Sequence, residues 1–522
     1  MSSLAKSAGV IGLATLSSRV LGLVRDSVQA RFFGAGSVMD AFVLATRIPT
    51  LLRDLFAEGA MSAAFVPTFT RYLTTSGKAA AWRLGSQVVN GLLAITATLV
   101  VIGIVFADPI TRFFAADNFR EIDLAAYLTQ INMPFLLLVA IAAAYMGMLN
   151  ALKRFFIPAL SPAMYNVVFI VCAITLGPLC VRLGLPAITA LAIGMLLGGV
   201  AQIVVQWPAL RREGYRHQWV LDPRDKGLHE VLVLMGPGTI GIAAAQINLF
   251  VNTVLATGTD GGASALSYAF RLMYLPIGII GVSVATAALP DLARQAAAHA
   301  HGDMRRTISS SLRMMFMLSV PATVGLMVLG RPIIELVLES GKFDALATSN
   351  TLQALLFYAP GILGYSVVKI ASPSFYALRD ARTPVIVSVV TIGLNLALNL
   401  ALHNAMGFKG LALGTSIAAT INAGVLLVLL SRRIGGVDTP RLIVSFVKIA
   451  IATALMGLAG WACAGWARTW WPGSGALAQI GRVFVPMGLA VAVLAAAAAL
   501  LRIDEFGQAL RRLRSRGTKP VA

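Results

Sequence analysis

The chain has 522 residues, of which 58% are hydrophobic and only 12% are charged, with a formal net charge of +20. Its mean hydropathy of +0.81 lies far outside the range of soluble globular proteins and indicates a polytopic membrane protein. The basic residues are dispersed in short loops, without a basic domain rich in aromatic residues, and this pattern argues against a nucleic-acid partner.

Apolar runs long enough to cross a bilayer repeat along the whole chain. The first is expected to be a retained helix and not a cleaved signal peptide, because its apolar run continues through Arg19 and Arg25. The three cysteines lie inside apolar runs, and neither a disulfide nor a metal site is implied. The sequence therefore predicts an all-α fold with about fourteen transmembrane helices. They are expected at residues 5–33, 38–70, 84–107, 122–150, 157–181, 187–210, 229–256, 263–289, 308–330, 350–377, 384–403, 409–431, 443–466 and 481–501.

The loops between these runs alternate in their content of Lys and Arg. The loops on one side of the predicted membrane contain more Lys and Arg than the loops on the other side. The basic side includes Lys6, Lys78 and the 211–228 loop. The positive-inside rule then places both termini in the cytoplasm, which requires an even number of spans. The longest cytoplasmic loop, at 213–228, concentrates charge, Pro and Gly, and is a plausible boundary between two lobes.

Charged residues interrupt the second predicted span. Asp40, Arg47 and Asp54 recur every seven positions and share one stripe of a straight helix, which Pro49 should bend. Arg53 widens this polar face, and Glu58 lies further along the same span. A charge at the centre of a membrane helix costs about 2.5–3.5 kcal/mol on insertion scales. The polar face is therefore expected to border an internal, hydrated cavity.

Other charges lie inside the first span and in the second half of the chain. Arg19 and Asp26 are seven residues apart, so either an internal ion pair or a direct role in a cavity is compatible with the sequence. Arg271 has no acidic residue within one helical turn in the sequence, and Lys369 is close only to Asp380 at the far end of its helix. An anionic ligand is one candidate to neutralise these cations.

The charges inside the predicted spans favour an anionic substrate. Arginine dominates among them, and its planar fork binds phosphate oxygens in pairs, so phosphate or pyrophosphate is the predicted ligand. The six cations are Arg19, Arg25, Arg47, Arg53, Arg271 and Lys369, and the four acids are Asp26, Asp40, Asp54 and Glu58.

Several long motifs resemble one family. They are SRVLGLVRD (18–26), FGAGSVMDAF (33–42), RIPTLLRDLFAEGAMSAAFVP (47–67), FRLMYLPIGIIGVSVATAALP (270–290) and KIASPSFYALRDARTPV (369–385). Together they resemble the MurJ (MviN) family of lipid II flippases, within the multidrug/oligosaccharidyl-lipid/polysaccharide exporter superfamily. The resemblance covers essentially the whole chain.

The resemblance implies an architecture of two six-helix lobes around a central cationic cavity, followed by two helices that form a groove for a lipid tail. The corresponding ranges are 1–212 for the first lobe, 213–228 for the connecting loop, 229–433 for the second lobe, 434–501 for the lipid-tail groove and 502–522 for a basic cytoplasmic tail. The implied substrate is lipid II, an undecaprenyl-pyrophosphate-linked disaccharide-pentapeptide. It would move from the cytoplasmic to the periplasmic leaflet of the bacterial inner membrane for peptidoglycan synthesis, by alternating access.

Residue roles follow from the matching motif positions. The resemblance implies that Arg19, Arg25, Arg53 and Arg271 bind the pyrophosphate, with Lys369 at a further matching position, and that Glu58 belongs to a gate. Asp26, Asp40, Arg47 and Asp54 would supply further gate or cavity charge. The chain departs from the family at Asp54, where a second arginine is usual, and at Phe270, where an aspartate often precedes the helix-eight arginine. No acidic residue lies between Glu230 and Asp260, so no sodium site is assumed.

Other functions fit the sequence less well. A flippase for another polyprenyl-pyrophosphate-linked glycan of the O-antigen type is the nearest alternative. A drug exporter should have a net acidic cavity, whereas cations outnumber acids in the predicted spans of this chain. A membrane-embedded transferase should have carboxylates clustered with histidines, and here the histidines lie apart from carboxylates. No GxxxxGK[ST] motif for ATP is present, and neither enzymatic activity nor a cofactor is expected. Protein partners of cell-wall synthesis or division are a further possibility.

Overall fold

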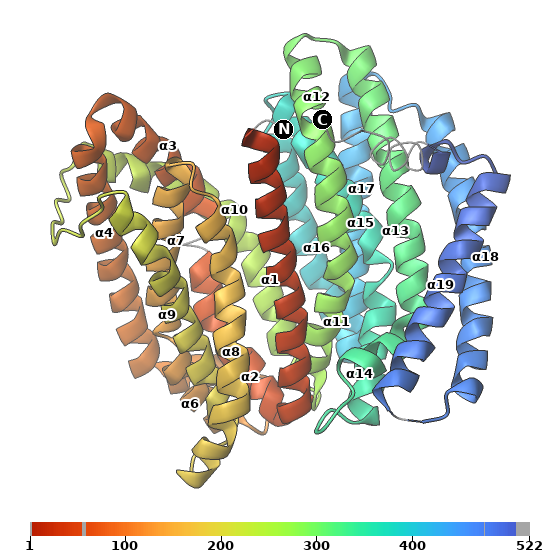
Figure 1. The fold of residues 1–522 in the computed structure, drawn as a ribbon, viewed down its shortest axis with the longest axis horizontal. Helices are drawn as coiled ribbons and strands as arrows, with labels where there is room; N and C mark the ends of the chain where they lie inside the picture. The colour runs from red at the N-terminus through yellow and green to blue at the C-terminus, as the bar shows by residue number, and fades with distance from the viewer. Residues whose placement is uncertain (1–2, 55–58, 474, 508–522) are drawn as a thin grey trace. The chain divides into compact units, whose positions relative to one another are not determined.

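The computed structural model describes residues 3–54, 59–473 and 475–507, and the side chains of these residues except 3–16, 59–63, 234–245, 247 and 476. Helices joined by short loops form nearly all of this part of the chain, which contains no strand (Figure 1). The chain divides into two compact units. The first is Met1–Ser264 with Leu338–Ala347, and the second is Ala265–Val337 with Thr348–Ala522. The all-α prediction is confirmed.

The first unit contains ten helices in the described part of the chain. Helix α8 packs against α1 and α9, while α7 packs against α3, α4 and α9 (Figure 1). Their bounds are α1 Ser3–Phe33, α2 Ser37–Arg53, α3 Gly59–Thr75, α4 Gly77–Val105, α5 Ala107–Phe113, α6 Ile122–Asn132, α7 Phe135–Ala151, α8 Phe156–Arg182, α9 Thr189–Arg212 and α10 Lys226–Ala256.

Aromatic rings form the core at one end of this unit. Phe65 and Phe69 of α3, Trp82 of α4 and Tyr215 of the loop after α9 stack in series, with ring centroids 5.3–5.6 Å apart. Tyr215 is fully buried. Gly147 of α7 lies against Phe65, where a Cβ would stand 2.8 Å from the ring. Small residues thus allow close helix packing, and the loop after α9 is anchored in the core.

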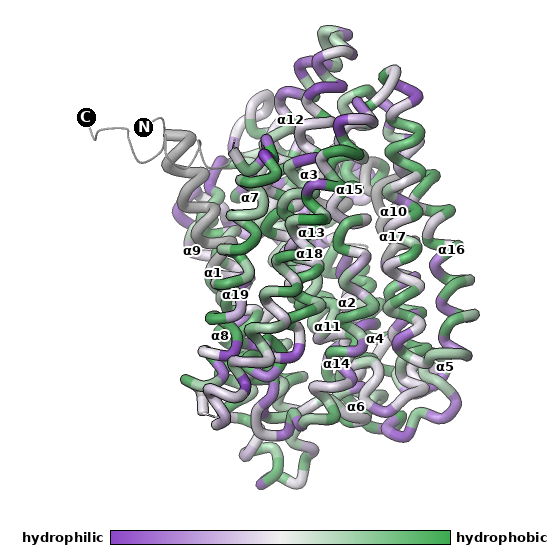
Figure 2. The backbone as a smooth tube through the Cα atoms, turned by 90° about the vertical axis from the view of Figure 1, so that its right-hand side faces the viewer, coloured by the Kyte–Doolittle hydropathy of each residue, from purple (hydrophilic) through white to green (hydrophobic). Residues whose placement is uncertain are grey.

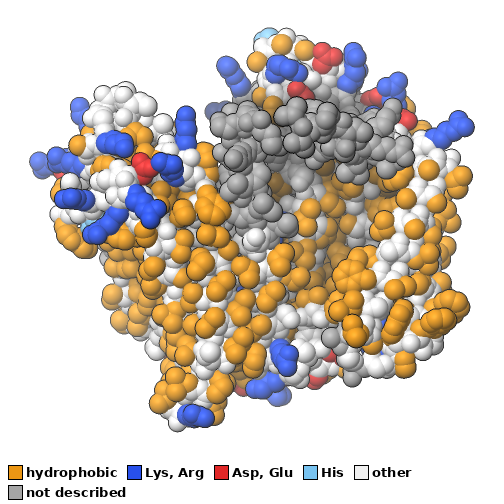
Figure 3. All heavy atoms as spheres, viewed as in Figure 1, with side chains coloured by type: hydrophobic (Ala, Val, Ile, Leu, Met, Phe, Trp, Pro, Cys, Tyr) orange, Lys and Arg blue, Asp and Glu red, His pale blue; other side chains and the backbone are white. Residues whose placement is uncertain are grey.

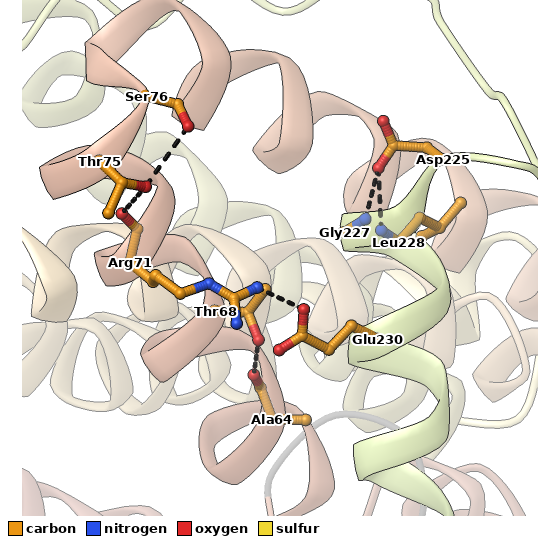
Figure 4. A network of polar contacts seen from close by, with 9 residues as sticks. All are labelled: Ala64, Thr68, Arg71, Thr75, Ser76, Asp225, Gly227, Leu228 and Glu230. Atoms are coloured by element: carbon orange, nitrogen blue, oxygen red, sulfur yellow. Dashed lines mark hydrogen bonds and ion pairs between the residues drawn. The ribbon is translucent and has the colours of Figure 1, made fainter.

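Polar contacts join the start of α10 to the end of α3 (Figure 4). Asp225 caps α10 by accepting hydrogen bonds from the backbone N–H groups of Gly227 (2.9 Å) and Leu228 (3.0 Å). The guanidinium of Arg71 on α3 forms an ion pair with Glu230 on α10. Helix α10 therefore belongs to the first unit, although it follows the predicted lobe boundary at 213–228. The predicted lobes stay a prediction.

The second unit continues the helical pattern with two breaks. Helix α11 runs into a π-helical turn, η2, before α12, and α14 meets α15 at an angle of 46°. The bounds are α11 Gly262–Pro276, η2 Ile277–Gly281, α12 Val282–Ala297, α13 His301–Val337, α14 Ala345–Tyr358, α15 Gly361–Ala377, α16 Arg382–Met406, α17 Phe408–Ile434, α18 Thr439–Trp470 and α19 Ala476–Leu500.

Two apolar clusters hold the second unit together. Helices α12, α13, α15 and α17 share one cluster, in which Phe375 and Leu426 are almost completely buried. Helices α13, α18 and α19 share the other, around Ile449 and Ala498. Gly364 of α15 lies so close to the backbone of Ala419 on α17 that a Cβ would stand 2.5 Å from it. The helices of this unit therefore also pack through small residues.

The helices are apolar along their length and hydrophilic towards their ends (Figure 2). On the face shown in Figure 3, hydrophobic side chains cover the flanks of the helices, and Lys and Arg side chains gather at their ends. Ten helices of the described chain are long and apolar enough to cross a membrane, or eleven if α14 and α15 form one bent span. The chain is thus a multi-pass membrane protein, while the count of fourteen stays a prediction.

The second predicted span, 38–70, consists of two helices in the described residues. Helix α2 contains Pro49 and ends at Arg53, and α3 begins at Gly59. Residues 55–58, and with them Glu58, lie outside the described residues, as does the part of the predicted basic tail at 508–522. The other predicted spans each coincide with one helix or with a broken helix.

Candidate functional site

The predicted site residues lie on four helices of the two units. Arg19, Arg25 and Asp26 lie on α1, and Asp40, Arg47 and Arg53 lie on α2, with Asp54 directly after it, all in the first unit. Arg271 lies on α11 and Lys369 on α15, in the second unit.

Arg25 is held by the next residue and by a neighbouring helix. Its Nε and Nη2 atoms donate to Oδ1 of Asp26 at 3.1 and 2.8 Å, and its Nη1 atom donates to Oδ1 of Asn166 on α8 at 3.1 Å. The guanidinium also lies 6.0 Å from the ring centre of Tyr165 and 5.7 Å from that of Phe169. Only 20% of the Arg25 side chain is exposed, so its charge is fixed in a partly desolvated position.

The structure pairs Asp26 with a residue that helical spacing did not indicate. The seven-residue spacing left open an ion pair with Arg19 or a direct role in a cavity, and the carboxylate of Asp26 accepts from Arg25. The long arginine side chain can fold back on its neighbour, although successive residues of a helix diverge by about 100°. Arg19 itself is half-buried on the same helix.

Arg53 repeats the geometry of Arg25. Its Nε and Nη2 atoms donate to Oδ1 of Asp54 at 2.8 and 2.6 Å. Asp54 is 8% exposed, and 26% of the Arg53 side chain is exposed. Asp54, where the resemblance implied a departure from the family motif, thus pairs with Arg53. Arg25 and Arg53 therefore form two arginine–aspartate neighbour pairs with the same bonding pattern.

Asp40 lies in a different environment from these pairs. It is completely buried, and its Oδ1 atom accepts a hydrogen bond of 2.7 Å from the backbone N–H of Ser264 in the first turn of α11. Its Oδ2 atom has no hydrogen-bond partner within the described part of the chain. Asp40 thus fixes the start of the helix that carries Arg271. Arg47, seven residues after Asp40 on α2, is half-buried.

The two cations of the second unit flank a helix irregularity. Arg271 precedes the π-helical turn η2 by six residues, and Lys369 packs against the last residue of that turn. A Cβ on Gly281 would stand 3.5 Å from Cγ of Lys369, so the glycine leaves room for the lysine stem. Both cations are half-buried. Single π-helical turns inside α-helices are frequent at functional sites.

Sequence reasoning missed a buried ion pair in the second unit. Nη1 of Arg313 on α13 lies 2.7 Å from Oε1 of Glu505, and the Oγ of Ser445 on α18 donates to Oε2 at 3.2 Å. The Glu505 side chain is 3% exposed. The available signal was Arg313 itself, a cation within the predicted span 308–330. The polar partner of Arg25, Asn166, was also missed, because 141 residues separate the two.

Metal ligands do not gather in the described chain. Among the residues that the structure describes, no group of three or more His, Cys, Asp and Glu side chains is placed to hold a metal ion. The site is therefore characterised by its paired and half-buried cations.

Comparison with known families gives a consistent match. The family model described as "Lipid II flippase MurJ" matches residues 29–480. The chain is 35% identical to the "Probable lipid II flippase MurJ" of Vibrio cholerae, over 81% of this chain and 82% of that protein. It is 34% identical to the "Lipid II flippase MurJ" of Burkholderia cenocepacia, over 86% of this chain and 88% of that protein.

Solved structures with the same fold have been determined. One described as "Lipid II flippase MurJ, inward closed conformation" aligns with a TM-score of 0.79 and 26% identity, over 95% of this chain and 99% of that one. An inward-facing multidrug resistance transporter of the MATE family aligns with a TM-score of 0.69, over 82% of this chain and 99% of that one. At 16% identity, the latter likeness concerns the fold alone.

Proposed function

The chain belongs to the MurJ family of lipid II flippases, and from this premise we propose how its charged helices serve the transport of lipid II. As a flippase, the protein moves the lipid-linked peptidoglycan precursor across the membrane. The family match favours lipid II over other polyprenyl-pyrophosphate-linked glycans. The transported head group must pass through the bilayer together with the negative charges of its pyrophosphate.

The two arginine–aspartate neighbour pairs carry the proposal. Each arginine presents its charge in a partly buried position, and each donates two hydrogen bonds to a carboxylate oxygen of the next residue. A pyrophosphate offers more anionic oxygens than one carboxylate, and the guanidinium fork binds phosphate oxygens in pairs. We propose that the pyrophosphate replaces Asp26 and Asp54 at Arg25 and Arg53, and that the aspartates recover the arginines after release.

The cations of the second unit are also candidates to bind the head group. Arg271 precedes the π-helical turn η2 on α11, and Lys369 of α15 packs against Gly281 at the end of that turn. We propose that both bind the head group during alternating access, and that Arg19 contributes on α1. Asp40 acts as a positioning residue because its carboxylate holds the first turn of α11.

The cellular setting follows from the charge of the loops. We propose that the protein lies in the bacterial inner membrane with both termini in the cytoplasm, where it acts as a transporter without enzymatic activity. The membrane potential would assist outward movement of an anion by about 2.3 kcal/mol per charge per 100 mV. Proteins of cell-wall synthesis or division are proposed as its partners.

The proposal is tested in cells whose only lipid II flippase is this protein. Arg53→Ala and Arg271→Ala should leave the protein inserted, trap lipid II on the cytoplasmic face and stop growth. Arg112→Ala is the matched control, because Arg112 is an exposed arginine that pairs with Asp108 and Asp123 on the surface of α5 and α6. Normal lipid II export by either site variant would refute the assignment of that arginine.

A further inference from the structure

The loop between α9 and α10 lies along the outer side of α4. The side-chain amide of Asn90 donates to the carbonyl oxygens of Gln218 (2.8 Å) and Val220 (2.9 Å). The backbone N–H of Gln218 donates to Oγ of Ser86 at 3.2 Å. These bonds satisfy backbone groups that would otherwise be costly next to hydrocarbon. The segment can therefore lie against the part of α4 that enters the membrane.

A groove of about 460 Å³ is lined by residues of this segment and of α4. Apolar side chains line it almost entirely, and Asn90 is the polar exception. Trp219 is 83% exposed and Leu221 is 47% exposed, although the backbone on both sides of Trp219 is hydrogen-bonded to α4. The lining residues are Asn90, Leu93, Ala94, Ala97, Trp219 and Leu221.

The position along α4 indicates a hydrocarbon ligand. An irregular, charged loop cannot border hydrocarbon at the bilayer centre, so the groove that it lines lies near the boundary between the loops and the hydrocarbon core. Further along the same helix, Val101 and Val105 are 61% and 66% exposed, as expected for residues that face lipid chains. The groove thus lies where α4 enters the acyl chains of the leaflet next to the loop.

The loop above the groove carries an excess of positive charge. Between Arg211 and Lys226 there are five basic and three acidic residues. The acidic residues are engaged locally: Glu213 pairs with Arg154 at 2.8 Å, Asp222 accepts from the N–H of Arg224, and Asp225 caps α10. Figure 3 shows Lys and Arg side chains gathered at this end of the first unit. This charge is complementary to an anionic head group.

We propose that the groove binds one acyl chain of an anionic diacyl phospholipid of the cytoplasmic leaflet, whose head group contacts the basic loop. Trp219 and Leu221 cover the chain from the loop side, and Ala94 and Ala97 leave space for it on α4. The bound phospholipid fastens the connecting loop to the bilayer. This lipid site is separate from the transport of lipid II.

Fluorescence quenching by brominated phospholipids tests the proposal on the full-length protein in phosphatidylcholine vesicles. The emission of Trp219 is obtained as the difference between the wild type and Trp219→Phe. Brominated phosphatidylglycerol should quench this emission more strongly than brominated phosphatidylcholine at the same content. We expect the binding constant for phosphatidylglycerol to be about five times that for phosphatidylcholine, which corresponds to the attraction between one basic side chain and an anionic head group.

Two variants and one matched control sharpen the test. Ala94→Phe fills the groove and should reduce the ratio of the binding constants for the two lipids to one. Val101→Phe places the same ring on α4 outside the groove and should leave this ratio unchanged. Arg216→Gln removes an exposed charge from the loop and should lower the ratio without filling the groove. Equal quenching by the two lipids overturns the proposal, as does a preference that survives both Ala94→Phe and Arg216→Gln. Stronger quenching by a brominated polyprenyl phosphate than by phosphatidylglycerol would assign the groove to a prenyl chain and also overturn it.

Discussion

At the scale of single residues, the chain neutralises two intramembrane arginines with the residues that follow them. A lone charge in a bilayer is costly, and a paired carboxylate on the next residue lowers that cost. Arg25 and Arg53 use this arrangement with the same atoms, Nε and Nη2 on one aspartate oxygen. We propose that such pairs keep a cation available inside the membrane until the pyrophosphate binds.

The geometry around Arg25 predicts that a lysine cannot replace it. Arg25 donates to Asp26 and to Asn166 at the same time, and one ammonium on a shorter stem cannot reproduce this fork. Arg25→Lys should therefore transport lipid II about tenfold more slowly, which corresponds to one lost charge-assisted hydrogen bond of roughly 1.5 kcal/mol. The rate is measured as outward movement of lipid II in cells that express equal amounts of each variant. A wild-type rate would mean that charge alone is sufficient at this position.

Asp40 should affect stability as well as transport. Asp40→Ala leaves the N–H of Ser264 without its acceptor in a buried site, at a cost of roughly 1–3 kcal/mol. Asp40→Asn retains a carbonyl oxygen and should cost less. Melting temperatures in detergent should follow the order wild type, Asn variant, Ala variant. Equal melting temperatures for all three proteins would show that the bond to Ser264 does not stabilise the fold.

The sequence predicted on which helices the candidate cations lie, but not their partners. Hydropathy placed Arg25, Arg53, Arg271 and Lys369 in helices, and their role as binding residues stays a prediction. Helical spacing left open an ion pair of Asp26 with Arg19 and did not indicate Arg25, because it describes where Cα–Cβ bonds point and not how a long side chain folds back. The contact with Asn166 depends on how α8 packs against α1, which no local pattern encodes.

At the scale of structural elements, buried polar contacts fix segments that hydropathy alone leaves free. The segment after α19 is one such case, because Glu505 follows the last apolar run. Its carboxylate is joined to α13 through Arg313 and to α18 through Ser445. These two bonds hold the end of the described chain against the second unit.

Removal of this buried charge should destabilise the second unit. Glu505→Gln leaves Arg313 without its anion, and breaking one partner of a buried ion pair costs roughly 3–5 kcal/mol. Asp291→Asn is the matched control, since Asp291 pairs with Arg294 in an exposed i, i+3 position and should change stability little. The comparison is made by thermal unfolding in detergent. A similar small effect of both variants would show that the Arg313 pair is solvated.

The connecting loop should respond to pH through His217. Burial lowers the pKa of this imidazole, whose Nδ1 lies 3.1 Å from the hydroxyl of Tyr215. The unfolded chain therefore binds a proton more readily than the folded chain, so stability should be lost as the pH falls below about 6.5. His217→Gln should remove this part of the pH dependence, as measured by melting temperatures between pH 5 and 8. An unchanged slope would indicate that His217 is protonated equally in both states.

Most helices could be predicted from hydropathy, because the bilayer demands long apolar segments with internal hydrogen bonds. The breaks were harder to predict. Helix α2 continues through Pro49 to Arg53, and the bend expected at Pro49 stays a prediction. The π-helical turn at Ile277–Gly281 directly follows Pro276, and its last residue packs against Lys369. Hydropathy gives no periodic signal for such a turn.

At the scale of the whole molecule, the chain consists of two compact helical units and belongs to a family of lipid II flippases. The first unit contains Arg19, Arg25 and Arg53, and the second contains Arg271 and Lys369. We propose that the cations of each unit bind the head group during transport. Loss of cations on either unit alone should then stop transport.

Movement of fluorescent lipid II in vesicles that contain only this purified protein tests this account most directly. Wild-type protein should make lipid II in the inner leaflet accessible to an external quencher, and inorganic pyrophosphate should compete. Arg25→Ala together with Arg53→Ala, and Arg271→Ala together with Lys369→Ala, should each reduce the rate to that of protein-free vesicles. Unchanged rates in both double variants would contradict the central claim that these cations bind the pyrophosphate during transport.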